Sequence, residues 1–183
     1  MKLHLWLFLA FTLIPLMTNA KVLPEIFYGP YYDFKSENFL DYLNTCRKGL
    51  FHRFNNFKKF TIFFEENEDP TKFDIVQGWV DKNHTYYRGI TLGVPFETVD
   101  DDDKNIKILW TLQNETLYEQ RLDENGNKTN DYPPTQHYFV GTELITQYFM
   151  YMVYPRGKQP RRLYAKLYYY RGFYKSLWDR IFS

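Results

Sequence analysis

The sequence has a single cysteine, Cys46, among its 183 residues. An intrachain disulfide is therefore excluded, and the fold must be stabilised by packing and hydrogen bonding. The sequence also lacks a Gly-x-Ser-x-Gly elbow, a His-Glu-x-x-His pair and a phosphate-cradling glycine loop. Because those motifs carry hydrolase, metalloprotease and nucleotide chemistry, their absence predicts a protein that is not an enzyme and needs no cofactor or metal.

An excess of charge of either sign is also missing, since 23 lysines and arginines face 22 acidic residues. Proteins that bind nucleic acids normally present a basic surface to the phosphates, so no nucleic-acid partner is expected. The densest acidic run is Asp100–Asp103. Four successive side chains do not converge on one ion without a looped backbone, so this run is interpreted as a solvated hairpin tip.

Long apolar runs occur only at the N-terminus, where Leu3–Leu16 follows Lys2 and precedes Thr18-Asn19-Ala20. That stretch is too short for an ordinary membrane span and is typical of a secretory signal peptide, predicted over residues 1–20, with an uncleaved anchor as the alternative. The protein is accordingly expected to be secreted and extracellular. Three N-glycosylation sequons suit that route, and they begin at Asn83, Asn114 and Asn127.

Aromatic residues, in contrast, are abundant: 17 tyrosines and 17 phenylalanines bring the aromatic share of the chain to 21%. They favour strands, and short strands separated by turn signals without βαβ alternation indicate an antiparallel sandwich or a closed barrel. Strands are expected within 25–34 and at 60–64, 73–80, 84–92, 106–112, 117–122, 136–140, 143–153 and 161–170.

One segment has helical rather than strand spacing. Ser36 is placed to cap a helix, and the apolar residues that follow recur at helical intervals until Gly49 interrupts them. Two short helices are therefore predicted, at about 37–45 and 47–56, as an αα-hairpin after the first strand.

Several motifs occur in the order found in one known family. Gly29–Leu43 has a Gly-x-aromatic start followed by Asn-Phe and Tyr-Leu, Ile90–Phe96 has an apolar-x-Leu-Gly-x-x-Phe pattern, and Arg162-Leu163-Tyr164 comes near the end. Over roughly Gly29 to Tyr164 the chain resembles the fatty acid-binding proteins, also called intracellular lipid-binding proteins, which are calycins. It departs at Asp33, where an apolar residue is usual, and at Leu40, where an acid is usual.

The resemblance implies an all-β fold: a ten-stranded antiparallel up-and-down β-barrel with a two-helix lid after the first strand. The barrel is expected over residues 21–166, followed by a C-terminal extension at 167–183. Because secreted members with a leader are known among nematodes, the leader suggests a nematode-like branch.

The resemblance also implies a ligand site. Arg162 and Tyr164, two apart on a strand, would share a face and hold a carboxylate through a guanidinium and a hydroxyl. A solvated strand face with alternating basic and aromatic residues is the alternative. The family's second arginine falls at about His137. If His137 faces inward, ligand affinity would depend on pH, because histidine titrates near pH 6.5; an ordinary strand position or a slipped alignment is the other interpretation.

Phe39 and Tyr42 would border the ligand portal on the helical lid, or serve only to dock the lid on the barrel. The basic, aromatic tail Tyr168–Phe182 has helix-like spacing. It is interpreted either as a segment packed on the barrel or as an interfacial helix, so transient membrane contact through lid or tail is a possible function.

Together these features predict an extracellular carrier that binds long-chain fatty acids or similar apolar lipids inside a barrel. Two alternatives stay open: a lipocalin-like carrier of a retinoid, sterol or small amine, and a barrel glycoprotein that has lost ligand binding.

Overall fold

The structure, a computed structural model, describes residues 21–39, 60–79, 84–99, 105–123, 125–128, 133–152 and 161–172. For residues 79, 150–152 and 161–163 it describes the backbone alone. A short 3-10 helix, η1 (Glu25–Phe27), precedes ten strands. These are β1 (Gly29–Glu37), β2 (Phe60–Glu66), β3 (Phe73–Trp79), β4 (His84–Ile90), β5 (Pro95–Val99), β6 (Asn105–Gln113), β7 (Thr116–Leu122), β8 (Thr135–Val140), β9 (Glu143–Met152) and β10 (Arg161–Arg171).

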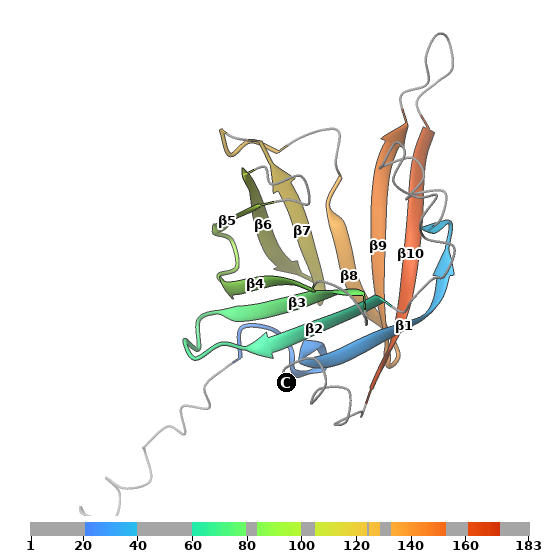
Figure 1. Cartoon of the computed structure of the whole chain (residues 1–183), viewed down its shortest axis with the longest axis horizontal. Helices are drawn as coiled ribbons and strands as arrows, with labels where there is room; N and C mark the ends of the chain where they lie inside the picture. The colour runs from blue at the N-terminus through green and yellow to red at the C-terminus, as the bar shows by residue number, and fades with distance from the viewer. Residues whose placement is uncertain are drawn as a thin grey trace, which may run out of the picture.

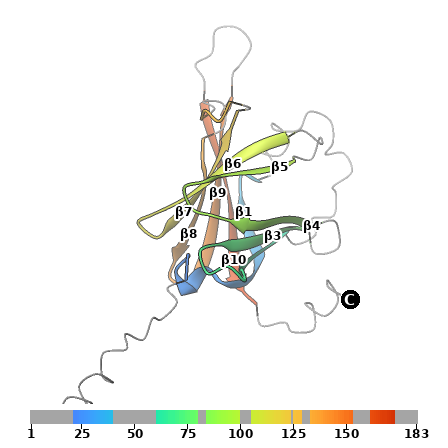
Figure 2. The same cartoon turned by 90° about the vertical axis from the view of Figure 1, so that its left-hand side faces the viewer.

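The ten strands form one antiparallel sheet in the order β4-β3-β2-β1-β10-β9-β8-β7-β6-β5. Consecutive strands are neighbours except β4 and β5, which form the two edges of the sheet, and the first strand, β1, pairs with the last, β10, as Figures 1 and 2 show. The sheet curls so that its edge strands β4 and β5 approach each other, and the rings of Tyr87 and Phe96 meet edge-to-face at 5.9 Å between centroids. The all-β, ten-stranded, nearly closed barrel predicted from the sequence is therefore confirmed.

The barrel wall follows from the alternation of side chains along each strand. On β2, Ile62 and Phe64 point into the interior cluster, whereas Phe63 packs on the outside against Tyr32 and Val76. Burial on both faces explains why this strand is a continuous apolar run rather than an alternating one.

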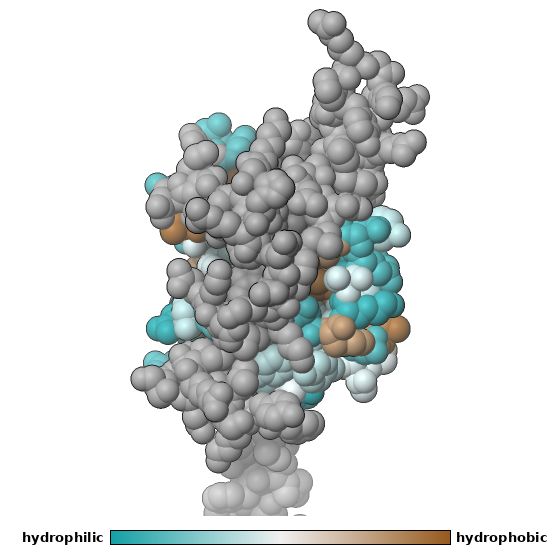
Figure 3. Space-filling view, turned by 45° about the vertical axis from the view of Figure 1, so that its right-hand side comes forward, coloured by the Kyte–Doolittle hydropathy of each residue, from teal (hydrophilic) through white to brown (hydrophobic). Residues whose placement is uncertain are grey.

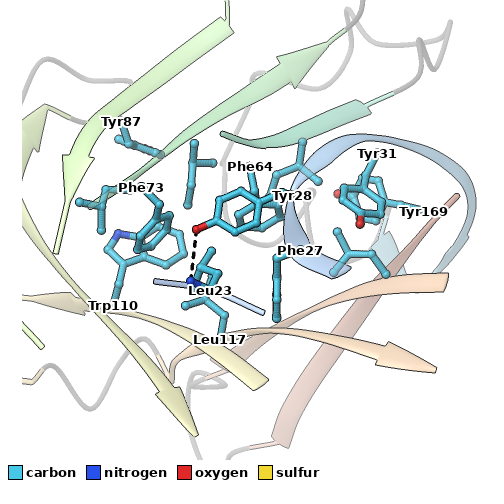
Figure 4. Packing of buried hydrophobic residues seen from close by; sticks show 14 of the residues in the cluster. Leu23, Phe27, Tyr28, Tyr31, Phe64, Phe73, Tyr87, Trp110, Leu117 and Tyr169 are labelled. Carbon is cyan, nitrogen blue, oxygen red and sulfur yellow. Dashed lines mark hydrogen bonds between the residues drawn. The ribbon is translucent and has the colours of Figure 1, made fainter. Parts of the chain in front are cut away.

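The segment before β1 fills one part of the interior, as Figure 4 shows for Leu23, Phe27 and Tyr28. Phe27 is fully buried and meets Phe64 of β2 edge-on at 5.5 Å and Phe139 of β8 at 5.0 Å. The Tyr28 hydroxyl accepts a hydrogen bond from the Leu23 amide at 3.2 Å. Because β2 and β8 are not neighbours in the sheet, Phe27 connects two walls of the barrel.

Gly29 occupies a position that needs glycine. Its φ is 128°, and a Cβ there would lie 3.1 Å from the Arg171 guanidinium. That guanidinium donates to the Tyr28 carbonyl at 2.6 Å. The glycine therefore lets the end of β10 close tightly on the start of β1.

Two sequence predictions need adjustment, and a third lies outside the described residues. The strand β5 was not predicted as a separate element, although a hairpin was expected there. Residues 168–171 continue β10 past the barrel boundary predicted at residue 166, so this part of the tail is strand and not helix. The predicted helices lie almost entirely outside the described residues, so the two-helix lid stays a prediction. Within the described part of the chain, no helix has the length and apolar character needed to cross a membrane.

Candidate functional site

The two residues of the Arg-x-Tyr motif lie on β10, and the structure places Tyr164 on the outside. Ala165 and Tyr169 are fully buried, so the odd-numbered positions of this strand face inward. Tyr164 is 45% exposed, with the Lys166 ammonium 5.9 Å from its ring centroid. The expectation that Tyr164 faces the interior is therefore not met in this strand register. Arg162 pairs with Tyr151 of β9, and its side chain is outside the description.

His137 of β8, in contrast, faces inward, the condition on which its predicted role depends, and it is 1% exposed. Its Nδ1 lies 3.0 Å from the Thr146 hydroxyl on β9. Its ring stacks on Trp110 of β6 at 5.8 Å between centroids, and meets the edge of Phe64 at 6.0 Å. A polar ring is thus fixed inside an otherwise apolar wall.

Glu119 of β7 completes this group, which is called here the interior polar cluster: Trp110, Glu119, His137 and Thr146. Trp110 and Glu119 are direct cross-strand partners, so their side chains share the inner face. The Glu119 carboxylate oxygen lies 3.7 Å from His137 Nε2, and its side chain is only 12% exposed. Within the described part of the chain, His137 Nε2 and Trp110 Nε1 are buried without a hydrogen-bond partner. Buried polar groups of this kind normally have a partner, which makes the cluster a candidate for ligand contact.

Three tyrosines surround the cluster. Burial raises the pKa of Tyr148 and Tyr169 well above the ordinary phenol value, and nearby Glu119 acts in the same direction on Tyr148. Burial also raises the pKa of Tyr87 to about 12, although a hydrogen bond from Gln77 at 3.4 Å opposes the shift. All three hydroxyls are therefore neutral hydrogen-bonding groups at physiological pH.

Charged residues of both signs occupy inward-facing positions of the described strands, and the arginine at such a position on β10, Arg171, donates to the Tyr28 carbonyl. Asp33 of β1 is the direct cross-strand partner of Tyr169, so it shares the inner face, and its Oδ1 is buried. Among the side chains that the structure describes, no lysine or arginine is buried. Arg121 shares the face of Glu119 on β7 but is exposed. The departure from the family pattern noted at Asp33 thus places a second carboxylate inside the barrel.

Phe39 is buried and its ring lies 5.8 Å from that of Tyr148, so it contacts the inner wall close to the polar cluster. This contact fits both interpretations of Phe39, portal and docking. Tyr42 lies outside the described residues.

Sequence reasoning did not identify Tyr169, Glu119 or Trp110 as site residues. For Tyr169, the signal was the alternation of inward and outward residues along β10. Starting that alternation at the C-terminal end of the strand, rather than at Arg162, would have placed Tyr169 on the inner face. The signal for Glu119 was a charged residue two positions after Leu117, and therefore on the same face of the strand as that apolar residue.

The sequons occupy different settings. Asn114 is exposed in the turn between β6 and β7, with a φ of 48°. Asn127 is also exposed, but its amide nitrogen donates to Asp123 at 3.3 Å. Asn83 and the acidic run 100–103 lie outside the described residues. No group of potential metal ligands occurs in the part of the chain that the structure describes.

The outer surface is mixed rather than uniformly apolar. In the view of Figure 3 the described residues are mainly hydrophilic, with small hydrophobic patches between them. On the outside of β1 and β10, Phe34 is 49% exposed and lies 6.0 Å from the ring of Tyr170.

Comparison with known proteins agrees with this architecture. No family model matches the sequence. Fatty acid-binding protein homolog 2 of Caenorhabditis elegans is 32% identical over 135 residues, covering 70% of this chain and 80% of that protein. Homolog 1 of the same organism is 28% identical over 153 residues, covering 81% and 90%. Among solved structures, "As-p18, an extracellular fatty acid binding protein" superposes with a TM-score of 0.64 at 22% identity, over 83% of this chain and 100% of that one.

The fold and its interior define a calycin-type barrel with an apolar wall and a polar cluster inside. The identity to the first of these relatives, over four fifths of its length, then assigns the chain: it belongs to the fatty acid-binding protein family. These relatives are named for binding and not for catalysis, which supports the prediction that the chain is not an enzyme.

Proposed function

We propose that this protein is an extracellular carrier that holds a long-chain lipid inside its barrel, with the lipid's polar end at the interior polar cluster. One observation carries the proposal: in a largely apolar and aromatic inner wall, His137 and Trp110 bury nitrogens that have no hydrogen-bond partner in the described part of the chain. Membership of the fatty acid-binding protein family supports it.

The physical basis is the different needs of the two ends of such a ligand. Each buried methylene of an alkyl chain contributes about 0.8 kcal/mol. The polar end is costly to bury unless it finds hydrogen-bond partners. A wall of aromatic side chains with one polar group meets both needs, and the neutral hydroxyls of Tyr148 and Tyr169 add donors close to that group.

Secretion is the second part of the proposal. It rests on the leader at residues 1–20 and the exposed sequon at Asn114. As-p18, described as extracellular, is a precedent for this barrel outside cells. Membrane contact through the lid or the tail would be a means of ligand transfer, and it depends on segments outside the described residues.

Displacement of a neutral fluorescent probe, N-phenyl-1-naphthylamine, by oleate and oleyl alcohol tests the carrier function. Displacement by at least one of them at micromolar concentration is expected, together with a lipid-sized mass increase in native mass spectra of protein purified without delipidation. A barrel filled by its own side chains would give neither signal, and that result would overturn the proposal.

The same assay compares two positions of the anchor. If the interior polar cluster binds the polar end, Tyr169→Phe should weaken binding by about 2- to 10-fold, the usual effect of one lost hydrogen bond. Tyr164→Phe, on the outer face, is the matched control and should change nothing. Loss of binding in Arg162→Ala and Tyr164→Phe, with Tyr169→Phe unaffected, would instead favour the Arg-x-Tyr anchor.

A further inference from the structure

The interior polar cluster presents a carboxylate where a fatty acid would place its own. A ligand carboxylate within hydrogen-bonding distance of His137 Nε2 would come close to Glu119, because the Glu119 oxygen is only 3.7 Å from that nitrogen. Both groups would be negatively charged in a site where solvent screening is weak. The repulsion disfavours a free fatty acid while His137 is neutral.

Cations that could offset this repulsion are scarce nearby. No lysine or arginine is buried among the described side chains. Arg121, on the same face of β7, is exposed, and Asp33 adds a second acid on the inner face opposite Tyr169. Arg171, at an inward-facing position of β10, is also exposed, and its guanidinium donates to the Tyr28 carbonyl. The charged group that the described structure places beside His137 Nε2 is therefore the Glu119 carboxylate, which disfavours an anionic head group at this point.

The hydrogen-bonding groups of the cluster call for a ligand group that both donates and accepts. Trp110 Nε1 only donates, the Glu119 carboxylate only accepts, and neutral His137 Nε2 takes either role according to its tautomer. A carboxylate only accepts, and an ammonium only donates, so each leaves one side of the cluster without a partner. A hydroxyl combines both roles, since it can accept from an N–H such as that of the indole and donate to a carboxylate or an imidazole nitrogen.

From this geometry we infer that the barrel selects a long-chain lipid with an uncharged hydroxyl head group, such as a fatty alcohol, over the free fatty acid of the same chain length. The inference rests on the proposed carrier function. It adds the chemical class of the ligand and identifies Glu119 as the residue that sets the selectivity.

Competition between two ligands that differ only in the head group tests the inference. At pH 7.5, oleyl alcohol should displace N-phenyl-1-naphthylamine at a concentration about tenfold lower than oleate. Equal or better displacement by oleate would overturn the inference and leave the carrier function standing. If neither lipid displaces the probe and native spectra show no bound lipid, the carrier function fails and the inference fails with it.

Glu119→Gln isolates the residue responsible, since it removes the charge and keeps the shape. The variant should bind oleate about tenfold more tightly and oleyl alcohol within about threefold of the original protein. Glu97→Gln is the matched control, because Glu97 is an exposed acid on β5 that pairs with Lys107; it should change neither affinity. Unchanged oleate binding in Glu119→Gln would contradict the assignment, and circular dichroism of both variants verifies that they fold.

Discussion

At the scale of the residue, His137 fixes the polar group of the interior, and its Nε2 lies 3.7 Å from the Glu119 carboxylate oxygen. The other groups packed on it, Thr146, Trp110 and Phe64, carry no charge. Tyr148 beyond them stays neutral because burial raises its pKa.

At this same scale the sequence left the orientation of His137 open and predicted that Tyr164 faces inward, whereas the structure places His137 inside and Tyr164 outside. The difference lies in register. His137 is four residues before Gly141 in a tight turn that fixes its face, whereas β10 follows a long connection whose length a motif does not determine. A shift by one residue moves a side chain to the other face of a sheet, so a motif of two residues cannot establish which face it occupies.

At the scale of elements, the 3-10 helix η1 has a larger role than its three residues suggest. Phe27 contacts β2 and β8, two strands that the sheet keeps apart. Burial of this ring is thus part of what holds the curled sheet closed. Nothing in the strand periodicity indicated the contact, because the segment has no regular spacing of its own.

Phe27→Ala should lower the free energy of unfolding by about 3–5 kcal/mol, the cost of removing a buried aromatic ring from a packed core. Urea unfolding followed by tryptophan fluorescence measures the change. Ile26→Ala is the neighbouring control, since Ile26 is 39% exposed, and it should alter stability by about 0.5 kcal/mol or less. Similar losses for both variants would show that η1 is not anchored through Phe27.

At the scale of the whole molecule, the strand pattern of the sequence predicted an antiparallel sandwich or a closed barrel, and the family resemblance selected the ten-stranded up-and-down barrel. The pairing of β1 with β10, which curls the sheet, is a long-range contact that the strand pattern alone does not indicate. The ligand's head group is different, because it depends on which side chains meet across β6, β7, β8 and β9. Two cross-strand registers had to be known before Glu119 and His137 could be placed together.

Secretion is also a property of the whole molecule, and the secretion hypothesis leads to a prediction about Asn114. This residue is exposed in the β6–β7 turn, so a glycan attached there would extend into solvent without disturbing the wall. When expressed in eukaryotic secretory cells, the protein should reach the medium with a mobility that N-glycosidase increases, and Asn114→Gln should remove one glycan. Asn125→Gln, an exposed asparagine outside any sequon, should leave the mobility unchanged. Retention of the protein inside the cell would contradict the signal peptide, whereas secretion with no change in Asn114→Gln would contradict only the use of this sequon.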